Sequence, residues 1–356
     1  MKRKGVNYDV GRVMMGEEWR PTFDPTVVHR ELEIIKHDLH CNAVRICGRD
    51  LDRLMIATED ALTQGLEVWF SPEMWDKSQE ETLDYLVKAA AAVERLRRSY
   101  PQQLVLSVGS ELTLFMQGIV EGQNFLERMG HPTFWEQIKA GVHNKPLNAF
   151  LRGANETVRQ VFRGKITYMS VPFETVDWSL FDFVGVDIYR EARIKDVFGD
   201  MIKRYFAHNK PVTIGEFGCC TYQGAENAGG MGWAIVDLQT SPMQLKGEYV
   251  RDEALQAREI TDVLRIFDDI GVDGAFVFTF VSPASPYHED LKYDLDMASY
   301  SLVKSYADKH GLTYPDMFWE PKKSFQAVAD YYAKQEVRSE GMSTWHGLVK
   351  DAGSSK

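Results

Sequence analysis

The chain has 356 residues, of which 44% are hydrophobic and 26% are charged, a composition typical of a folded chain with one large core. Its formal net charge of −11 and its lack of a basic tract argue against a nucleic-acid or anionic-lipid partner. No apolar run is long enough to span a bilayer, and no signal peptide is visible, so we expect a cytoplasmic protein without a membrane partner.

Short apolar segments alternate along the chain with segments whose apolar residues recur at helical spacing. The eight predicted strands are residues 5–8, 43–47, 67–71, 104–108, 166–170, 183–188, 212–214 and 274–280. The predicted helices are residues 27–39, 51–64, 80–98, 147–162, 194–207, 251–270 and 324–336, with a short helix near 177–181. This alternation predicts an α/β fold, and a count of eight favours a closed (β/α)8 TIM barrel over an open sheet.

The connections differ in length in a way that fits a barrel with a walled site. Helix-to-strand connections are short, whereas four strand-to-helix connections are long: residues 9–26, 112–146, 221–250 and 281–323. In a barrel these long βα loops lie on the face that carries chemistry. We predict one catalytic barrel over residues 1–336, followed by a partly disordered C-terminal extension at 337–356 that ends in Gly-Ser-Ser-Lys.

Two glutamates end apolar runs, Glu111 after Leu104–Ser110 and Glu216 after Pro211–Gly215. Alternation along a strand would place Glu111 on one face with Ser107 and Gly109. Either glutamate alone is ordinarily a helix cap or an ion-pair partner. Because they follow the fourth and seventh predicted strands, they would point at each other across the barrel mouth, as the two carboxyls of a retaining glycosidase do.

This layout resembles the clan A glycoside hydrolases, a large group of retaining (β/α)8-barrel enzymes that includes cellulases, mannanases and β-galactosidases. The resemblance implies that Glu111 is the acid/base and Glu216 the nucleophile. Asn-Ala-Val-Arg, ending at Arg45, resembles the strand-two motif whose arginine contacts the nucleophile. Gly-Val-Asp-Ile-Tyr, ending at Tyr189, resembles the strand-six motif whose tyrosine hydrogen-bonds it.

The sequence departs from the clan pattern at positions next to these residues. Ser110 stands where the clan usually has an asparagine that contacts the sugar 2-hydroxyl, and Asp187 stands where many members have histidine. Strand eight lacks the usual tryptophan platform, so Phe278 or Phe280 would have to serve. These departures leave the sugar open and also keep a pocket without hydrolytic activity in consideration.

Aromatic and polar loop residues near the predicted mouth complete the candidate site. Trp75 and Trp233 are expected to bind substrate, since flat rings pack on sugar faces. Two or three of the following seven rings are expected to line the site: Trp19, Trp69, Trp75, Trp135, Trp233, Tyr222 and Tyr287. Specificity could also come from the loop residues Arg12, Glu73, Arg190 and Glu191, although solvated loop positions are the ordinary expectation for these side chains.

The sequence therefore predicts a retaining glycoside hydrolase that cleaves a small glycoside or oligosaccharide by double displacement, without a cofactor or metal. A magnesium site built from Asp182, Asp187 and Glu216 is disfavoured, because Asp182 precedes its strand. The alternatives are a carbohydrate-binding barrel without turnover and a barrel lyase or isomerase with Glu216 as base. The sugar and the oligomeric state stay open.

Overall fold

Eight parallel strands close into a barrel in the order β1-β12-β9-β8-β7-β6-β5-β4. The computed structural model describes residues 1–14 and 16–334, so the predicted extension at 337–356 lies outside the described residues. The predicted (β/α)8 TIM barrel is confirmed. Its strands are β1 (Arg3–Asp9), β4 (Ala43–Gly48), β5 (Glu67–Pro72), β6 (Leu104–Ser110), β7 (Lys165–Ser170), β8 (Val184–Asp187), β9 (Val212–Phe217) and β12 (Gly274–Val277).

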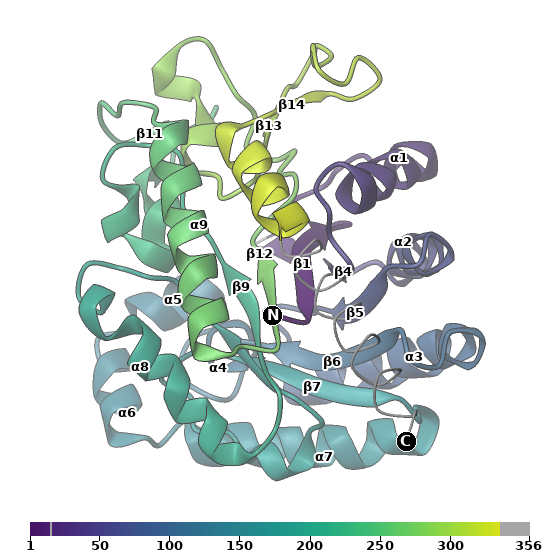
Figure 1. Ribbon diagram of the computed structural model, residues 1–356. Coiled ribbons are helices and arrows are strands. Elements are labelled where there is room, and N and C mark those ends of the chain that lie inside the picture. Colours follow the sequence, from purple (N-terminus) through teal and green to yellow (C-terminus); the bar gives the residue numbers. More distant parts are fainter. Residues whose placement is uncertain (15, 335–356) are drawn as a thin grey trace, which may run out of the picture.

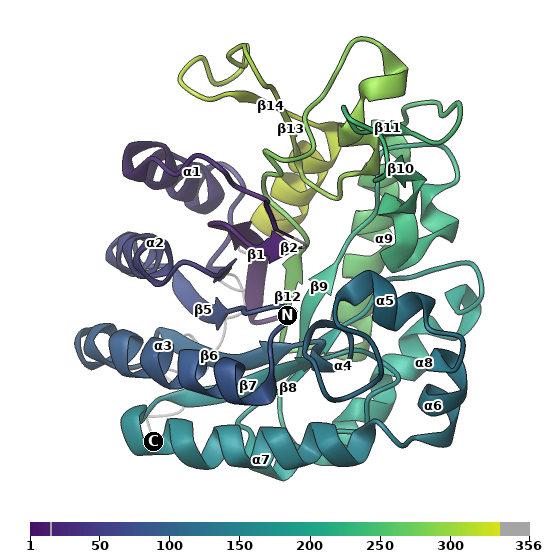
Figure 2. The ribbon, with the colours of Figure 1, turned by 180° about the vertical axis from the view of Figure 1, so that it is seen from behind.

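Helices surround the strands as an outer layer (Figures 1 and 2). The predicted short helix of the fifth connection is the 3₁₀ turn η1 (Trp178–Leu180), and residues 323–334 form the last described helix. The remaining helices of this layer are α1 (Pro25–His37), α2 (Leu51–Thr63), α3 (Gln79–Ser99), α7 (Asn144–Val161), α8 (Phe198–Lys203), flanked by η2 (Lys195–Val197) and η3 (Arg204–His208), and α9 (Glu253–Ile270).

The four long βα loops fold into small elements of their own. After β1 come β2 (Val13–Met14) and β3 (Glu17–Glu18), and after β6 come α4 (Leu112–Phe115), α5 (Phe125–Gly130) and α6 (Phe134–Ala140). After β9 come η4 (Ala225–Asn227), η5 (Gly229–Ile235), β10 (Val236–Asp237) and β11 (Gln244–Leu245). After β12 come η6 (Leu291–Tyr293), η7 (Leu295–Ala298), β13 (Val303–Ser305) and β14 (Trp319–Pro321). The loops therefore build a wall around one end of the barrel.

Helix α3 shows how local sequence sets an element of this layer. Ser78 caps its N-terminus in a capping box with Glu81, which satisfies free backbone N–H groups. Leu86, Ala90 and Val93 recur at helical spacing and are buried. Their spacing gives the helix one apolar face to pack on the barrel.

Inside the barrel, an apolar layer of side chains lies below a polar layer near the mouth. Trp69, Phe183 and Phe276 pack together within one buried apolar cluster, with ring centroids 4.9 and 5.2 Å from Trp69. Trp69 was predicted as one of the rings near the mouth, but it is fully buried in this cluster, because its position on β5 points into the barrel. Ala43 of β4 belongs to the same cluster. Two residues after Ala43 and Trp69 on their strands, Arg45 and Ser71 form a buried polar layer beneath the mouth.

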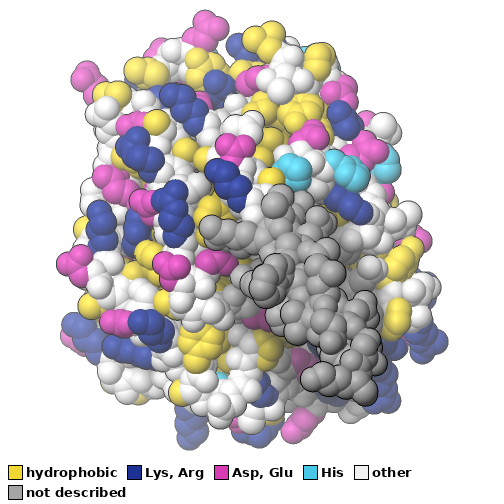
Figure 3. Space-filling view, viewed as in Figure 1, with side chains coloured by type: hydrophobic (Ala, Val, Ile, Leu, Met, Phe, Trp, Pro, Cys, Tyr) yellow, Lys and Arg dark blue, Asp and Glu magenta, His cyan; other side chains and the backbone are white. Residues whose placement is uncertain are grey.

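The outer surface carries both signs of charge. On the face seen in Figure 3, basic and acidic side chains are interspersed. Within residues 1–14 and 16–334, no helix is long and apolar enough to cross a membrane.

Phe280 was predicted to bind substrate, and the structure shows that this is wrong. Strand β12 ends at Val277, and Phe280 turns into the layer outside the barrel, where it is fully buried. Its ring packs against Tyr8, Trp319 and Phe325 at centroid distances of 6.3, 5.4 and 6.4 Å. Phe280 is therefore a core residue, and Phe278 is the strand-eight ring that reaches the pocket.

Replacing Phe280 with alanine should lower the free energy of unfolding by about 3–5 kcal/mol, because a large fully buried ring leaves a cavity. Urea unfolding followed by circular dichroism measures this loss. The matched control is Phe318→Ala, whose side chain is 49% exposed and which should cost less than about 1 kcal/mol. Equal losses in the two variants would contradict the core placement of Phe280.

Candidate active site

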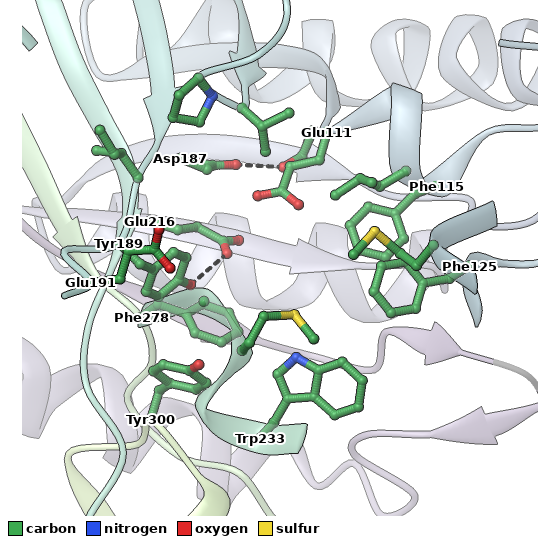
Figure 4. Close-up of a pocket in the computed structure, with 18 of the residues that line it drawn as sticks. Glu111, Phe115, Phe125, Asp187, Tyr189, Glu191, Glu216, Trp233, Phe278 and Tyr300 are labelled. Carbon is green, nitrogen blue, oxygen red and sulfur yellow. Dashed lines mark hydrogen bonds between the residues drawn. The ribbon is translucent and has the colours of Figure 1, made fainter. Parts of the chain in front are cut away.

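The candidate residues meet at the carboxyl ends of the barrel strands. Glu216 lies on β9 and Asp187 ends β8, while Glu111 follows β6 directly. This is the end of an α/β barrel at which catalytic groups gather. One carboxyl oxygen from each of these three residues lies within 4.8 Å of the other two. The structure thus brings together the two predicted catalytic glutamates and a third carboxyl group (Figure 4).

Glu216 receives hydrogen bonds on both of its carboxylate oxygens. Its Oε1 accepts from Nη1 of Arg45 at 2.8 Å and from Nη2 of Arg12 at 2.9 Å. Its Oε2 accepts from the Tyr189 hydroxyl at 3.1 Å (Figure 4). The contacts expected of Arg45 and Tyr189 are therefore present, and Arg12 adds a third. Two cations and a hydroxyl donor favour and orient an ionised carboxylate.

A second carboxylate holds the two arginines in place. Glu73 accepts from Arg12 Nε at 2.5 Å and from Arg45 Nη2 at 3.2 Å, and Ser71 donates to it at 3.1 Å. Burial alone raises the pKa of Glu73, but the Arg12 and Arg45 guanidiniums outweigh burial and hold that pKa below its ordinary value. Glu73 thus stays ionised and balances the second guanidinium charge.

Arg12 and Glu73 are the functional candidates that the sequence analysis placed among ordinary loop residues. Both are buried, and they are linked by two hydrogen bonds. A signal was present in their positions, because Glu73 directly follows β5 and Arg12 lies three residues after β1. Their burial comes from the aromatic loops above them, including Trp19, Trp75 and Phe278 around the Arg12 guanidinium.

Glu111 has an unusual backbone conformation, with φ 50° and ψ 42° in the left-handed region. Such a conformation costs a non-glycine residue about 1–3 kcal/mol and persists only where its surroundings fix it. The Leu112 amide donates to the Tyr168 hydroxyl at 2.9 Å, and the Thr113 amide donates to Glu174 at 3.1 Å. These bonds hold the start of α4 and with it the direction of Glu111.

Strand alternation fails at this point, and both Ser110 and Glu111 line the same pocket. The register between β6 and β7 shifts between Ser107 and Ser110, and Gly109 has φ +149°. The predicted sharing of one face by Ser107, Gly109 and Glu111 is therefore wrong, since a bulge and a left-handed residue rotate the strand end.

The carboxyl group of Glu111 has a pKa well above its ordinary value. Burial is the main cause, and the negative charges of Asp187, Glu216 and Glu174 add to it. These surroundings therefore favour the protonated form of Glu111. Glu111, with its raised pKa, thus lies opposite Glu216, which accepts hydrogen bonds from two guanidiniums and a hydroxyl group, and such unlike surroundings suit a general acid and a nucleophile.

Asp187 is a third carboxyl group in the same cluster. Its Oδ2 accepts from the Ser110 hydroxyl at 2.7 Å, and its Oδ1 lies 3.8 Å from Arg45. Gly215 makes room for it, because a Cβ there would lie 2.4 Å from Oδ1. Burial raises the pKa of Asp187 to about 8; the Arg45 charge opposes the rise and the Glu216 charge adds to it.

The three clustered carboxyl groups are close enough to bridge a cation, yet their surroundings suit proton chemistry better. Arg45 lies against two of them and already supplies positive charge, so an added cation would be repelled. The magnesium set considered from sequence is not formed. Asp182 pairs with Arg159 and accepts from the Ile166 amide near the start of β7, as its place before the strand predicts.

A pocket of about 520 Å³ opens above the carboxyl groups. Of the seven rings considered from sequence, Trp19, Trp75 and Trp233 line it, and so does Phe278. Arg45 lies beneath the pocket and acts on it through Glu216. Glu191 reaches the pocket, whereas Arg190 is paired with Glu259.

Comparison with solved structures finds barrels of the same fold. A GH113 β-1,4-mannanase aligns with a TM-score of 0.60 at 15% identity, covering 94% of this chain and 99% of that chain. The GH113 β-mannanase of Alicyclobacillus acidocaldarius, solved with ManMIm, aligns with a TM-score of 0.59 at 14% identity, covering 94% of this chain and 97% of that chain. A Ruminococcus gnavus β-glucuronidase, solved with an N1-substituted uronic isofagomine, gives 0.55 at 14% identity over 93% of this chain and 49% of its own.

No protein-family model matches the sequence, and a search of curated proteins finds no match. At these identities the structural likeness establishes the fold, which is that of the clan A glycoside hydrolases, as the sequence motifs predict.

The raised pKa of Asp187 makes a prediction about stability and pH. The unfolded chain releases this proton near pH ~4, whereas the folded chain keeps it up to about 8. Folding therefore takes up a proton between these pH values. As a result, the free energy of unfolding of the wild type falls as pH rises through this window. The asparagine of Asp187→Asn cannot ionise, so this variant avoids the loss. The melting temperature of Asp187→Asn minus that of wild type should therefore be higher at pH 8 than at pH 5, by about 2 °C or more.

Differential scanning fluorimetry at both pH values measures this change. Asp52→Asn, which alters an exposed carboxyl group on α2, is the control and should track wild type. A melting-temperature difference for Asp187→Asn that does not change with pH would show that Asp187 ionises normally in the folded protein.

Proposed function

We propose that this chain is a retaining glycoside hydrolase in which Glu216 is the nucleophile and Glu111 the acid/base. The observation that carries the proposal is the pairing of two unlike carboxyl groups. Glu216 is held by two arginines and a tyrosine, and Glu111, with a raised pKa, has an oxygen within 4.8 Å of it. Retaining glycosidases place their carboxyls ~5–5.5 Å apart, whereas inverting enzymes leave ~6.5–9.5 Å for a water.

In the first step, the Glu216 carboxylate attacks the anomeric carbon and forms a glycosyl ester. The bond to the leaving oxygen breaks with its electron pair, and Glu111 donates its proton to that oxygen. As the negative charge of Glu216 is consumed, Arg12 and Arg45 remain paired with Glu73, so that the buried arginines keep a counter-charge.

In the second step, the ionised Glu111 removes a proton from water, and the water oxygen attacks the anomeric carbon from the face that the leaving group vacated. The ester bond to Glu216 breaks and the sugar leaves with its original configuration. Glu111 is then protonated again. Nearby Asp187 and Glu174 disfavour its ionised form, which makes it a stronger base in this step.

Kinetics of two variants test these roles. Glu216→Gln should reduce hydrolysis of every glycoside to the background rate, since no glycosyl ester forms. Glu111→Ala should reduce the rate of hydrolysis about 10²–10⁴-fold for substrates with poor leaving groups. The reduction should be far smaller for 2,4-dinitrophenyl glycosides, whose leaving group needs little protonation. Added azide should speed the second variant and yield a glycosyl azide of the substrate's configuration. Glu59→Gln, an exposed carboxylate on α2, is the matched control.

Proton NMR of the first-formed sugar completes this test. The wild type should release the same anomer as the substrate, and release of the opposite anomer would contradict retention. Sugar binding without turnover would favour the non-catalytic barrel. If the reaction is run in oxygen-18 water and the product contains none of the label, a lyase or isomerase with Glu216 as base would be favoured.

A further inference from the structure

The pocket has two chemically different halves. Charged and hydroxyl groups surround Glu216, whereas the side that follows Glu111 is apolar (Figure 4). We define the apolar lobe as six pocket-lining side chains from the loops after β6, β7 and β9: Leu114, Phe115, Phe125, Met129, Phe173 and Met231. No side chain of the lobe carries a hydrogen-bonding group stronger than a thioether sulfur.

The rings of the lobe are stacked on one another. Phe115 lies between Trp75, at a centroid distance of 4.2 Å and 12° between planes, and Phe125, at 5.0 Å and 19°. Phe125 in turn contacts Trp233 at 6.1 Å. A sugar packs on a free ring face, and both faces of Phe115 are already covered. Phe115 therefore presents only its ring edge to the pocket, which is an apolar surface and a poor sugar platform.

Chemistry places the leaving group on this side of the site. This inference rests on the proposed function, in which Glu111 protonates the leaving oxygen, so the aglycone extends from Glu111 away from Glu216. Leu114 and Phe115 belong to α4, which begins directly after Glu111. A sugar unit here would lose water from its hydroxyls without gaining partners, whereas an apolar group would gain from burial.

We propose that the substrate is a glycoside with a bulky apolar aglycone, an alkyl or aryl group of about the size of an octyl chain, seated in the apolar lobe. Met129 and Met231 can adjust to such a group, because unbranched thioether side chains fit varied apolar shapes. Met231 is 45% exposed at the rim, so a longer aglycone can extend into solvent.

Methyl and octyl glycosides of one sugar test this inference, because their leaving groups have similar acidity and differ mainly in apolar size. The sugar is first chosen as the one that the wild type hydrolyses best as its 4-nitrophenyl glycoside. Its methyl glycoside, its octyl glycoside and a disaccharide with the same terminal sugar are then compared by kcat/KM. The octyl glycoside should exceed the methyl glycoside by at least ~100-fold, since each buried methylene contributes to discrimination. A disaccharide preferred over the octyl glycoside would overturn the inference.

Two variants connect the preference to the lobe. Met231→Gln and Met129→Gln should each reduce the octyl-to-methyl ratio of kcat/KM about tenfold or more, because a polar amide in the lobe penalises the octyl chain more than the methyl group. The matched control is Met243→Gln, a 38% exposed methionine outside the pocket, which should leave the ratio unchanged. An unchanged ratio in both lobe variants would also overturn the inference.

Failure of the proposed function has a separate signature. If no glycoside is hydrolysed, the hydrolase assignment fails, and fluorescence titration with 2-naphthol tests the lobe alone. Saturable binding that is weakened by Met129→Gln and retained by Met243→Gln supports an apolar ligand at this place. Absence of binding overturns it.

Discussion

The buried ion network of Arg12, Arg45, Glu73 and Glu216 is the interaction on which the rest of the site depends. Its members come from four different barrel strands or the loops that follow them, so it forms only when those strand ends meet. Breaking a buried network by removing one partner leaves an uncompensated charge, at a cost of about 3–5 kcal/mol. The network thus links closure of the barrel to the orientation of Glu216.

The same network creates an electrostatic gradient across the mouth. Two guanidiniums contact Glu216, whereas Glu111 and Asp187 lie beside other carboxyl groups in desolvated surroundings that raise their pKa, and for Asp187 this rise prevails over the opposing charge of Arg45. Two carboxyl groups a few ångströms apart therefore have unlike surroundings, and those of Glu111 favour its protonated form. The left-handed backbone at Glu111, fixed by Tyr168 and Glu174, keeps its carboxyl group close to that of Glu216.

How much the sequence could predict depended on how far each residue lies from a regular strand. Arg45, Tyr189 and Glu216 could be placed because a buried parallel strand fixes which end its last residues reach. The burial of Arg12 and Glu73 could not be predicted, although both follow strand ends, since it comes from loops that pack over them. Phe280 was misplaced because the true end of β12 decides which ring enters the pocket. The shared face predicted for Ser107, Gly109 and Glu111 was wrong because a bulge breaks strand alternation.

Covalent trapping tests the central claim most directly. A 2-deoxy-2-fluoro glycosyl fluoride slows both chemical steps but retains a good leaving group, so that a glycosyl enzyme accumulates. Intact mass spectrometry followed by peptide mapping locates the added sugar. We expect one fluorosugar per chain, esterified to Glu216. A label on Glu111 or Asp187 would contradict the assignment of Glu216 as nucleophile. An enzyme that hydrolyses the parent glycoside but is never labelled by the fluorosugar would also contradict it.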